Sequence, residues 1–206
     1  MNVTAIDYSR DCTDLRDGLD PMSHLFDAEQ LHTLVHPVIG RPLPDIFDAL
    51  VDSLAARYPG HILREDEWIF NNAGGAMGMM RVLHASLTEY LILFGSPIGT
   101  EGHTGRLFAD DWFFILDGEQ WAYTEGALER EVYRPGDMHH LRRGVAKGYR
   151  MPGRCFALEY ARGMIPLMLP FGIADTLTST MDFRTLAKTF RVYTRGVTRE
   201  LRQGKI

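Results

Sequence analysis

The chain has 206 residues, of which 45% are hydrophobic and 24% charged, a composition typical of a globular protein that can bury its own core. The formal net charge of −5 argues against a nucleic-acid-binding protein, because neutralising phosphates requires a basic surface. The two cysteines, Cys12 and Cys155, are too few for a disulfide framework, so a reducing compartment is expected.

No segment of the sequence has the pattern of a membrane-spanning helix. Residues 1–20 are polar and acidic and lack the apolar stretch of a signal peptide. The longest apolar stretch, residues 163–174, is too short to cross a bilayer and contains Pro166 and Pro170. The sequence therefore predicts a protein that is cytoplasmic or bound peripherally to a membrane.

The first predicted elements are helices within residues 1–65. Pro59-Gly60 marks the end of the clearest helical pattern. The apolar residues of that pattern recur at helical spacing, at Leu43, Ile46, Phe47, Leu50, Val51, Leu54 and Tyr58.

Residues 66–162 carry short runs rich in aromatic and β-branched residues, separated by glycine or proline. One of the separators, Asp117-Gly118, is typical of a β-hairpin turn. Many short strands at this spacing predict a small antiparallel barrel or jelly roll. We therefore expect one mostly β, α+β domain spanning residues 1–206.

Residues 163–206 return to a helical pattern, and Asp182 can start a helix. One interpretation is an amphipathic helix lying on an anionic membrane surface, and the other is an ordinary helix packed on the barrel. The apolar positions are Phe183, Leu186, Phe190, Tyr193, Val197 and Leu201, and the basic ones are Arg184, Lys188, Arg191, Arg195, Arg199 and Arg202.

Glu159 lies in a strand-like apolar run, residues 155–160 (CFALEY). Strict alternation places it on one face with Cys155 and Ala157, away from Phe156 and Leu158. If that face is the interior, burial raises the pKa of Glu159 and makes it a proton donor near neutral pH. The alternative is an outward, solvated position, which is the commoner one for glutamate.

Other titratable residues are ambiguous on pattern alone. Asp110 and Asp111 are adjacent, so in a strand one points inward and the other outward. Either could supply a second carboxylate, or serve in a turn or an ion pair. Glu89 raises the same ambiguity, while His84 fits a core position. His103 lies in a Gly-His-Thr-Gly turn and could orient a carboxylate by hydrogen bonding.

His139-His140 follows Pro135-Gly136 in the manner of the second half of a cupin metal signature. The first half, a His-x-His followed by Glu, is absent, and a metal site normally needs three converging ligands. The sequence also lacks a phosphate-binding loop, a Rossmann fingerprint and a nucleophile elbow. We therefore expect no metal and no cofactor.

An ordered series of motifs resembles the fungal sterol 8,7-isomerases, and a thinner version of it is shared by the animal sigma-type receptor. The resemblance runs in register from about residue 60 to about residue 195. Its segments are residues 67–78 (EWIFNNAGGAMG), 83–86, 89–92, 99–105 (GTEGHTG), 108–111, 131–133, 135–136, 139–141, 146–147, 151–153, 156–159 (FALE), 169–172, 175–176 and 179–180.

The resemblance implies roles for several residues. The family's essential buried glutamate matches Glu159, its ligand-lining tyrosine matches Tyr90, and its turn histidine matches His103. The receptor's second cavity acid falls at Phe113, so Asp110 and Asp111, which match the isomerase branch, are the substitutes. The catalytic candidates are thus Glu159, Asp110, Asp111 and His103, and the candidate cavity-wall residues are Tyr90, Phe94, Met80, Trp121, Leu169 and Tyr193.

The resemblance also implies a cupin-like barrel (residues 66–162) behind an N-terminal helical segment (1–65). Two membrane-facing helices (163–206) are expected to cover the ligand cavity, and the assembly is expected to be a homotrimer. Relatives begin with a membrane-spanning helix that this sequence does not show, so an endoplasmic-reticulum membrane is expected only in a eukaryote.

The implied activity moves a sterol double bond from Δ8 to Δ7, and cationic amphiphilic amines are expected to inhibit it. Two alternatives remain open on the sequence. One is a receptor-like protein that binds sterols and amines without turnover. The other is an isomerase or cyclase that protonates a different terpenoid.

Overall fold

The computed structural model of the chain describes residues 24–206, so the expectations for residues 1–20 and for Cys12 lie outside the described part. Two helices, α1 (Ala28–Val35) and α2 (Leu43–Arg57), flank the 3-10 turn η1 (His36–Val38). Helix α2 starts at Leu43, where the apolar spacing predicted a helix, and its C-cap is Tyr58, just before Pro59-Gly60.

The strands form two antiparallel sheets. The larger sheet has the order β1-β2-β3-β10-β5-β8, and the smaller has the order β4-β9-β6-β7. The strands are β1 (Ile69–Ala73), β2 (Ala76–Ala85), β3 (Glu89–Ser96), β4 (Thr100–His103), β5 (Ala109–Asp117), β6 (Gln120–Thr124), β7 (Glu131–Tyr133), β8 (Met138–Leu141), β9 (Lys147–Met151) and β10 (Cys155–Gly163).

The mostly β, α+β architecture is confirmed, and only two details differ from a closed barrel. Within residues 24–206 the strand ladders form two separate sheets rather than one closed ring. The Asp117-Gly118 turn does not make a hairpin, because β5 pairs with β10 and β8 while β6 pairs with β7 and β9. A true hairpin turn is Gly74-Gly75, where Ala73 pairs with Ala76 and both glycines have positive φ.

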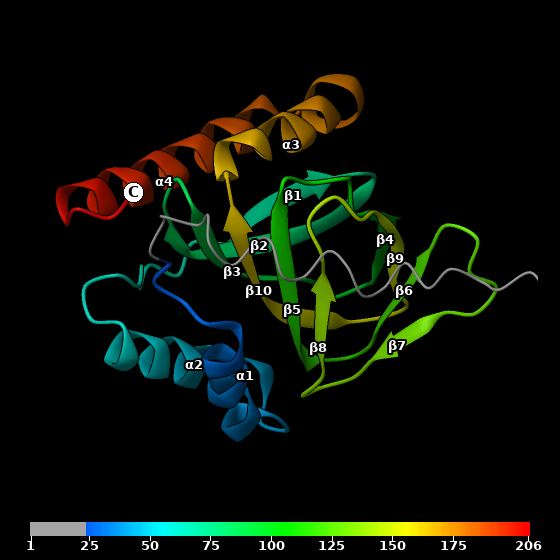
Figure 1. Cartoon of the computed structure of the whole chain (residues 1–206), viewed down its shortest axis with the longest axis horizontal. Coiled ribbons are helices and arrows are strands. Elements are labelled where there is room, and N and C mark those ends of the chain that lie inside the picture. The colour runs from blue at the N-terminus through cyan, green and yellow to red at the C-terminus, as the bar shows by residue number, and fades with distance from the viewer. Residues whose placement is uncertain (1–23) are drawn as a thin grey trace, which may run out of the picture.

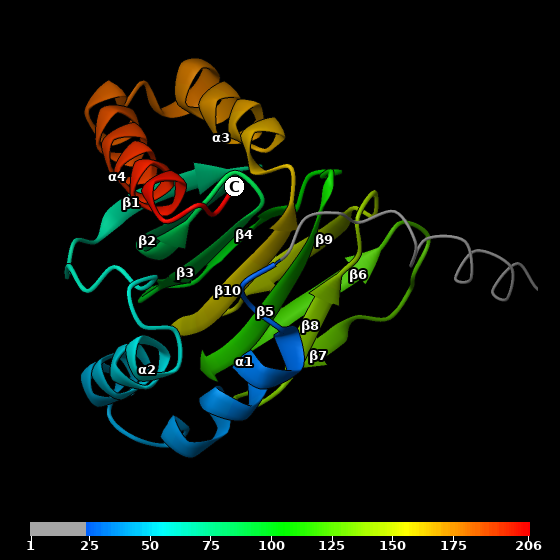
Figure 2. The same ribbon diagram turned by 60° about the vertical axis from the view of Figure 1, so that its left-hand side comes forward.

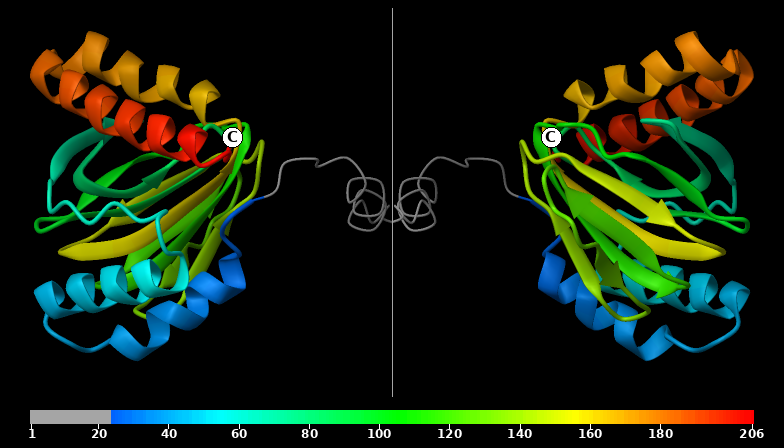
Figure 3. Two further views of the ribbon diagram at one scale, coloured as in Figure 1. Left: turned by 90° about the vertical axis from the view of Figure 1, so that its left-hand side faces the viewer. Right: turned by 90° about the vertical axis from the view of Figure 1, so that its right-hand side faces the viewer.

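The helices cover opposite sides of the sheets (Figures 1 and 3). On one side α1 and α2 pack on a core that includes Leu83, Leu93 and Tyr160. On the other side lie the 3-10 turn η2 (Ile165–Leu167), α3 (Leu169–Asp175), the π-turn η3 (Thr176–Thr180) and α4 (Phe183–Arg202). Figure 2 shows α3 and α4 lying above the strands of the larger sheet.

Helix α4 begins where the sequence predicted, at the N-cap Asp182, whose carboxylate accepts from the Thr185 backbone N–H at 3.0 Å. None of α3 is buried, and the buried residues of α4, Val192, Gly196 and Glu200, lie from its middle to its C-terminal end. The tight contact of α4 with the rest of the protein therefore runs from the middle of the helix to its C-terminal end. No helix in residues 24–206 combines the length and apolarity that a membrane crossing requires.

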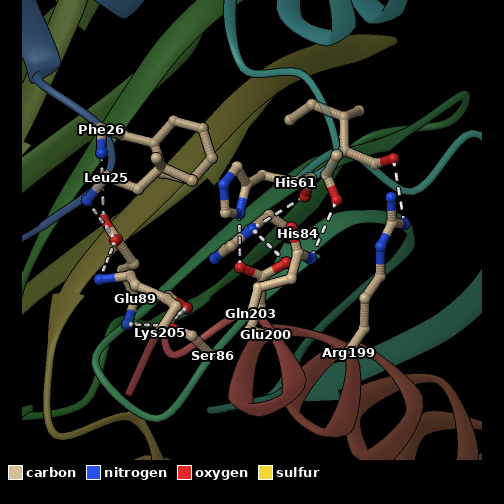
Figure 4. A network of polar contacts seen from close by, with 12 residues as sticks. Leu25, Phe26, His61, His84, Ser86, Glu89, Arg199, Glu200, Gln203 and Lys205 are labelled. Carbon is tan, nitrogen blue, oxygen red and sulfur yellow. Dashed lines mark hydrogen bonds and ion pairs between the residues drawn. The ribbon is translucent and has the colours of Figure 1, made fainter.

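A polar network fixes the C-terminal end of α4 to the segment between α2 and β1 and to His84 of β2 (Figure 4). The buried Glu200 lies 2.6 Å from Nδ1 of His61 and 3.8 Å from Nδ1 of His84. Arg199 donates to the carbonyl of Ile62 at 3.3 Å, and Gln203 to that of Gly60 at 3.2 Å. These contacts join residues about 140 positions apart in the chain.

Candidate active site

An apolar cavity of about 450 Å³ lies between the two sheets and beneath α3 and α4. This volume is within the range of roughly 300–1,000 Å³ found for ligand pockets. The larger sheet lines it with residues such as Ile92 and Phe113, the smaller sheet with Tyr149, and the helices with Phe171 and Phe190. Its walls therefore suit a hydrophobic ligand.

Glu159 is a carboxyl group in the wall of this cavity, only 8% exposed. Strand β10 alternates as predicted: Cys155 and Ala157 belong to the apolar cluster on the cavity side, while Leu158 and Tyr160 pack toward α1 and α2. The outward, solvated alternative for Glu159 is therefore wrong. The Tyr90 hydroxyl on β3 donates a hydrogen bond to the Glu159 carboxylate.

Asp111 is the second carboxyl group in the cavity wall, and it is 3% exposed. Its neighbour Asp110 faces the other side of β5, where it contacts His140 at 3.1 Å and the Arg143 backbone N–H at 3.1 Å. The hydrogen bond from His140 lowers the pKa of Asp110. The two aspartates thus divide as strand alternation requires, and Asp111 is the one beside Glu159.

The two cavity carboxyls share one apolar environment, which raises the pKa of both. Burial raises the pKa of Glu159 to about 7, against an opposing effect of the Tyr90 hydrogen bond. Burial, and next the charge of Glu159, raise the pKa of Asp111 well above its usual value. Two like charges in a dry cavity are costly, so the pair retains a proton at neutral pH. Such a pair combines a proton donor and a proton acceptor in one site.

His103 also lines the cavity, from the end of β4. Its Nδ1 accepts from the Gly105 backbone N–H at 2.9 Å, and its own backbone N–H donates to the Gly74 carbonyl at 2.9 Å. The Gly74 position needs glycine, since an added Cβ would lie 2.0 Å from the His103 carbonyl oxygen. The imidazole therefore orders the turn at Gly105 and the His103 backbone orders the turn at Gly74, and among residues 24–206 the imidazole makes no hydrogen bond to either carboxyl.

Five of the six candidate wall residues line the cavity: Met80, Tyr90, Phe94, Leu169 and Tyr193. The sixth, Trp121, does not. Its indole N–H donates to Glu119 at 3.0 Å, and the Arg130 guanidinium lies 3.8 Å from the ring centroid. Trp121 faces away because β6 is in the smaller sheet, where its neighbours Gln120 and Ala122 are the buried ones.

Glu89, the other carboxylate considered, is fully buried but faces away from the cavity. It accepts from the Leu25 backbone N–H at 2.6 Å, from the Tyr160 hydroxyl at 2.9 Å and from Lys205 at 2.8 Å. Burial alone would raise the pKa of Glu89, but the hydrogen bonds from Lys205, Leu25 and Tyr160 outweigh it and the pKa is lowered. Glu89 is thus an anchoring anion for the N- and C-terminal segments.

The His139-His140 pair does not converge on a common point. The buried His139 lies 2.7 Å from Gln120 and 3.2 Å from Lys147, while His140 stacks on Trp112 on the other side of β8. Burial lowers the pKa of His139 to about 4. Within residues 24–206 no group of three or more His, Cys, Asp or Glu side chains is arranged to hold a metal ion.

Sequence reasoning missed one titratable wall residue, Tyr149 on β9, which lines the cavity opposite the carboxyl pair. It also left Phe113 without a role, although its ring forms part of the wall. The available signal was the alternation of Lys147, Tyr149 and Met151, but strand β9 is too short and too partly buried for that pattern to stand out.

An apolar cavity with two buried carboxyl groups of raised pKa defines a site that suits a lipid-like molecule and proton exchange with it. The chain belongs to the family described as "ERG2 and Sigma1 receptor like protein", whose model matches residues 11–205. This confirms the family resemblance found in the sequence.

Among relatives, the C-8 sterol isomerase erg2 of Aspergillus fumigatus is 57% identical over 82% of this chain and 72% of its own length. The C-8 sterol isomerase of Pyricularia oryzae is 55% identical over 88% of this chain and 85% of its own. The sigma non-opioid intracellular receptor 1 of Taricha granulosa is 42% identical over 88% and 82%. The chain is therefore more similar to these isomerases than to this receptor.

Among solved structures, a cupin superfamily protein from Desulfitobacterium hafniense matches 60% of this chain and 91% of its own with 19% identity. The TM-score of 0.38 is too low for the match to bear on function.

Proposed function

We propose that this chain is a C-8 sterol isomerase, an enzyme that moves a sterol double bond from Δ8 to Δ7. The observation that carries the proposal is the pair of buried carboxyl groups, Glu159 and Asp111, in a cavity whose walls are otherwise mainly apolar. The high identity to relatives with that name supports it.

The reaction needs one proton donor and one proton acceptor and no change of oxidation state. A proton is added to C9 of the C8=C9 double bond, which leaves a tertiary cation at C8. A proton is then removed from C7, and the new double bond is C7=C8. One proton enters the sterol and one leaves it, so a carboxyl pair that starts with one shared proton also ends with one.

Asp111 suits the donor role, because burial and the neighbouring charge favour its protonated form. Glu159 suits the acceptor role, since its pKa of about 7 leaves a substantial ionised fraction at neutral pH. Transfer of the proton from Glu159 back to Asp111, directly or through solvent, resets the pair. His103 lines the cavity but is bonded to Gly105 rather than to either carboxyl, so it has no part in this proton transfer.

The apolar wall also stabilises the intermediate. An ionised Glu159 is an anion within the same cavity as the C8 cation, and the low polarity of the surroundings strengthens that attraction. Aromatic side chains such as Phe94 and Phe113 place ring faces around the cation. The same features favour binding of a cationic amphiphilic amine, whose charge resembles the intermediate.

The surface of η3 and α4 supports a peripheral membrane location. Exposed apolar side chains there include Leu177, Phe183 and Leu201, beside exposed Arg184 and Arg202. This combination suits the interface of an anionic bilayer, through which a sterol would reach the cavity. The homotrimer rests on the family resemblance and is testable by light scattering.

A test of the isomerase proposal supplies purified protein with a Δ8 sterol in deuterated water. The expected product is the Δ7 sterol with one solvent deuterium at C9, formed without added metal or nucleotide. Tight sterol binding with neither product nor deuterium uptake would instead identify a receptor-like binder. Turnover of a linear terpene but not of the Δ8 sterol would identify a terpenoid enzyme.

A further inference from the structure

Tyr149 is placed to act on the carboxyl pair from the opposite wall of the cavity. It lies on β9 of the smaller sheet, whereas Asp111 and Glu159 lie on β5 and β10 of the larger one. Its partners on the neighbouring strands are Gly102 and Ala122. Tyr149 itself lines the cavity, together with both carboxyls.

The two phenols near the carboxyl pair differ in their hydrogen bonds. The Tyr90 hydroxyl is already used, because it donates to Glu159. The Tyr149 hydroxyl makes no hydrogen bond with any residue in the described range 24–206. Asp111 shows the matching gap, since its buried Oδ1 has no partner among those residues. Tyr149, with an unused donor, and Asp111, with an unpartnered buried carboxylate oxygen, thus line the same cavity.

The charges of both carboxyls act on the Tyr149 hydroxyl. Burial raises the pKa of Tyr149, and the charges of Glu159 and Asp111 raise it further. Because these charges keep the phenol protonated, its hydroxyl can donate a hydrogen bond to either carboxylate. The donor is of most use when Asp111 becomes an anion, which happens as its proton passes to the sterol.

We propose that the Tyr149 hydroxyl donates a hydrogen bond to Asp111 as Asp111 gives up its proton. Each carboxyl then accepts a hydrogen bond from one tyrosine, Glu159 from Tyr90 and Asp111 from Tyr149. The inference rests on the proposed function and adds a third residue to the proton-transfer machinery. The hydrogen bond strengthens only as charge develops on Asp111, so it lowers the barrier without tightening sterol binding.

Other titratable groups near Asp111 make their hydrogen bonds and ion pairs with other partners. Asp110 is held by His140 and Arg143 on the far side of β5. His103 is bonded through Nδ1 to Gly105, and Asp182 caps α4. The titratable residues that line the cavity are Tyr90, His103, Asp111, Tyr149, Glu159, Asp182 and Tyr193.

The test compares wild-type protein with Tyr149→Phe, which removes one oxygen and keeps the ring. The expected kcat for the Δ8 sterol falls about 10- to 100-fold while KM changes less than about threefold. The alkaline limb of the pH profile moves up by about one unit, because the Asp111 anion has lost a donor. A carbon-13 NMR titration of the aspartate carboxyls, with Asp111 assigned through Asp111→Asn, should show the same rise without any turnover.

Tyr123→Phe is the matched control, since Tyr123 lies on β6 outside the cavity with its ring over Gly148 and is expected to leave every readout unchanged. A folded Tyr149→Phe protein with unchanged kcat and unchanged Asp111 titration would overturn the inference. A wild-type protein that turns over no sterol, together with a shifted Asp111 titration in Tyr149→Phe, would reject the isomerase proposal but uphold the Tyr149–Asp111 hydrogen bond.

Discussion

Asp111 and Glu159 lie on adjacent antiparallel strands, two positions out of register: Glu159 pairs with Phe113, and Asp111 pairs with Ala161. Diagonal neighbours of this kind are about 7–8 Å apart at Cα and point to the same face of a sheet. The Tyr90 side chain lies across from Ala161 on the other flanking strand. The small Ala161 therefore separates Tyr90 from Asp111 and leaves the Glu159 carboxylate accessible to both the cavity and the phenol.

Replacing Glu159 by glutamine should remove the proton acceptor but keep the shape of the side chain. We expect turnover of the Δ8 sterol to fall by a factor on the order of 10² to 10⁴. Affinity for a cationic amine should fall too, because its counter-charge is gone. Sterol conversion and amine titration measure the two effects. Near-normal turnover in a folded Glu159→Gln protein would show that the glutamate is structural.

Asp110 and Asp111 provide an internal comparison, because the same chemical change on opposite faces of β5 should have unequal effects. Asp111→Asn should lower turnover about as strongly as Glu159→Gln. Asp110→Asn should lose less than about tenfold, since this aspartate contacts His140 and Arg143 rather than the cavity. A larger loss at Asp110 would contradict the assignment of Asp111 as the donor.

The pH dependence of kcat/KM should follow the carboxyl pair. The acceptor must be ionised, so activity should rise as the pH passes about 7, where Glu159 loses its proton. Activity should fall at higher pH when Asp111 ionises, which happens well above its usual pKa. A profile measured from about pH 5 to pH 10 tests both limbs. A rate that declines steadily through neutral pH would assign the acid role to Glu159 instead.

The same titration should appear in the stability of the fold. Glu159 binds its proton more tightly in the folded chain, with a pKa of about 7 against 4.5. The stability that this provides is complete below the unfolded value and is lost as the pH rises through about 7, by roughly 3 kcal/mol. Glu159→Gln should therefore gain stability relative to wild type between about pH 5 and pH 8. Urea unfolding of both proteins at about pH 5 and pH 8 measures this difference in free energy of unfolding. The same change with pH in wild type and Glu159→Gln would contradict the prediction.

Gly196 of α4 packs closely against Ala85 of β2. An added Cβ would lie 2.9 Å from the Ala85 Cβ and 3.2 Å from its carbonyl oxygen. Gly196→Ala should lower the free energy of unfolding by about 1–3 kcal/mol although alanine is the better helix former. Gly172→Ala in α3 is the control, because its Cβ meets nothing within 4 Å and the change should not destabilise. Equal melting temperatures for the two variants would show that α4 is not tightly seated.

The exposed apolar side chains of the covering helices should determine membrane binding. Leu177 is 51% exposed and Phe183 is 55% exposed. Replacing both by serine should reduce the fraction of protein that floats with anionic vesicles, while Leu128→Ser, far from these helices, should not. High salt should also reduce the bound fraction, because interfacial helices bind partly through charge. Flotation that is insensitive both to the double serine replacement and to high salt would reject the peripheral membrane location.

Local periodicity was enough to predict elements whose two faces differ. Helix α2 could be predicted because its apolar residues keep to one stripe. The face of Glu159 could be predicted from the alternation in β10 once the family resemblance favoured an interior position. Both predictions depend on neighbours within a few residues, which a sequence displays directly.

Other features depended on contacts between distant strands. Nearly every residue of β5 is buried on both faces, so its alternation could not show which of Asp110 and Asp111 faces the cavity. Asp117-Gly118 has hairpin-type residues, but the strands that it joins belong to different sheets. Trp121 was misplaced for the same reason, since the orientation of β6 follows from its pairing with β9, about 25 residues further along the chain.

Helix α4, which Glu200 attaches to His61, follows all the described strands in the chain. This order has a consequence for folding during synthesis. The cavity is closed by α3 and α4, whose residues follow all ten strands in the chain. On the ribosome, the sheets and their apolar cavity wall emerge before the helices that cover them. A nascent chain that stalls before residue 183 therefore exposes the hydrophobic cavity wall, to which chaperones or a membrane can bind. Packing of α4 on the sheet then covers the cavity that contains the carboxyl pair.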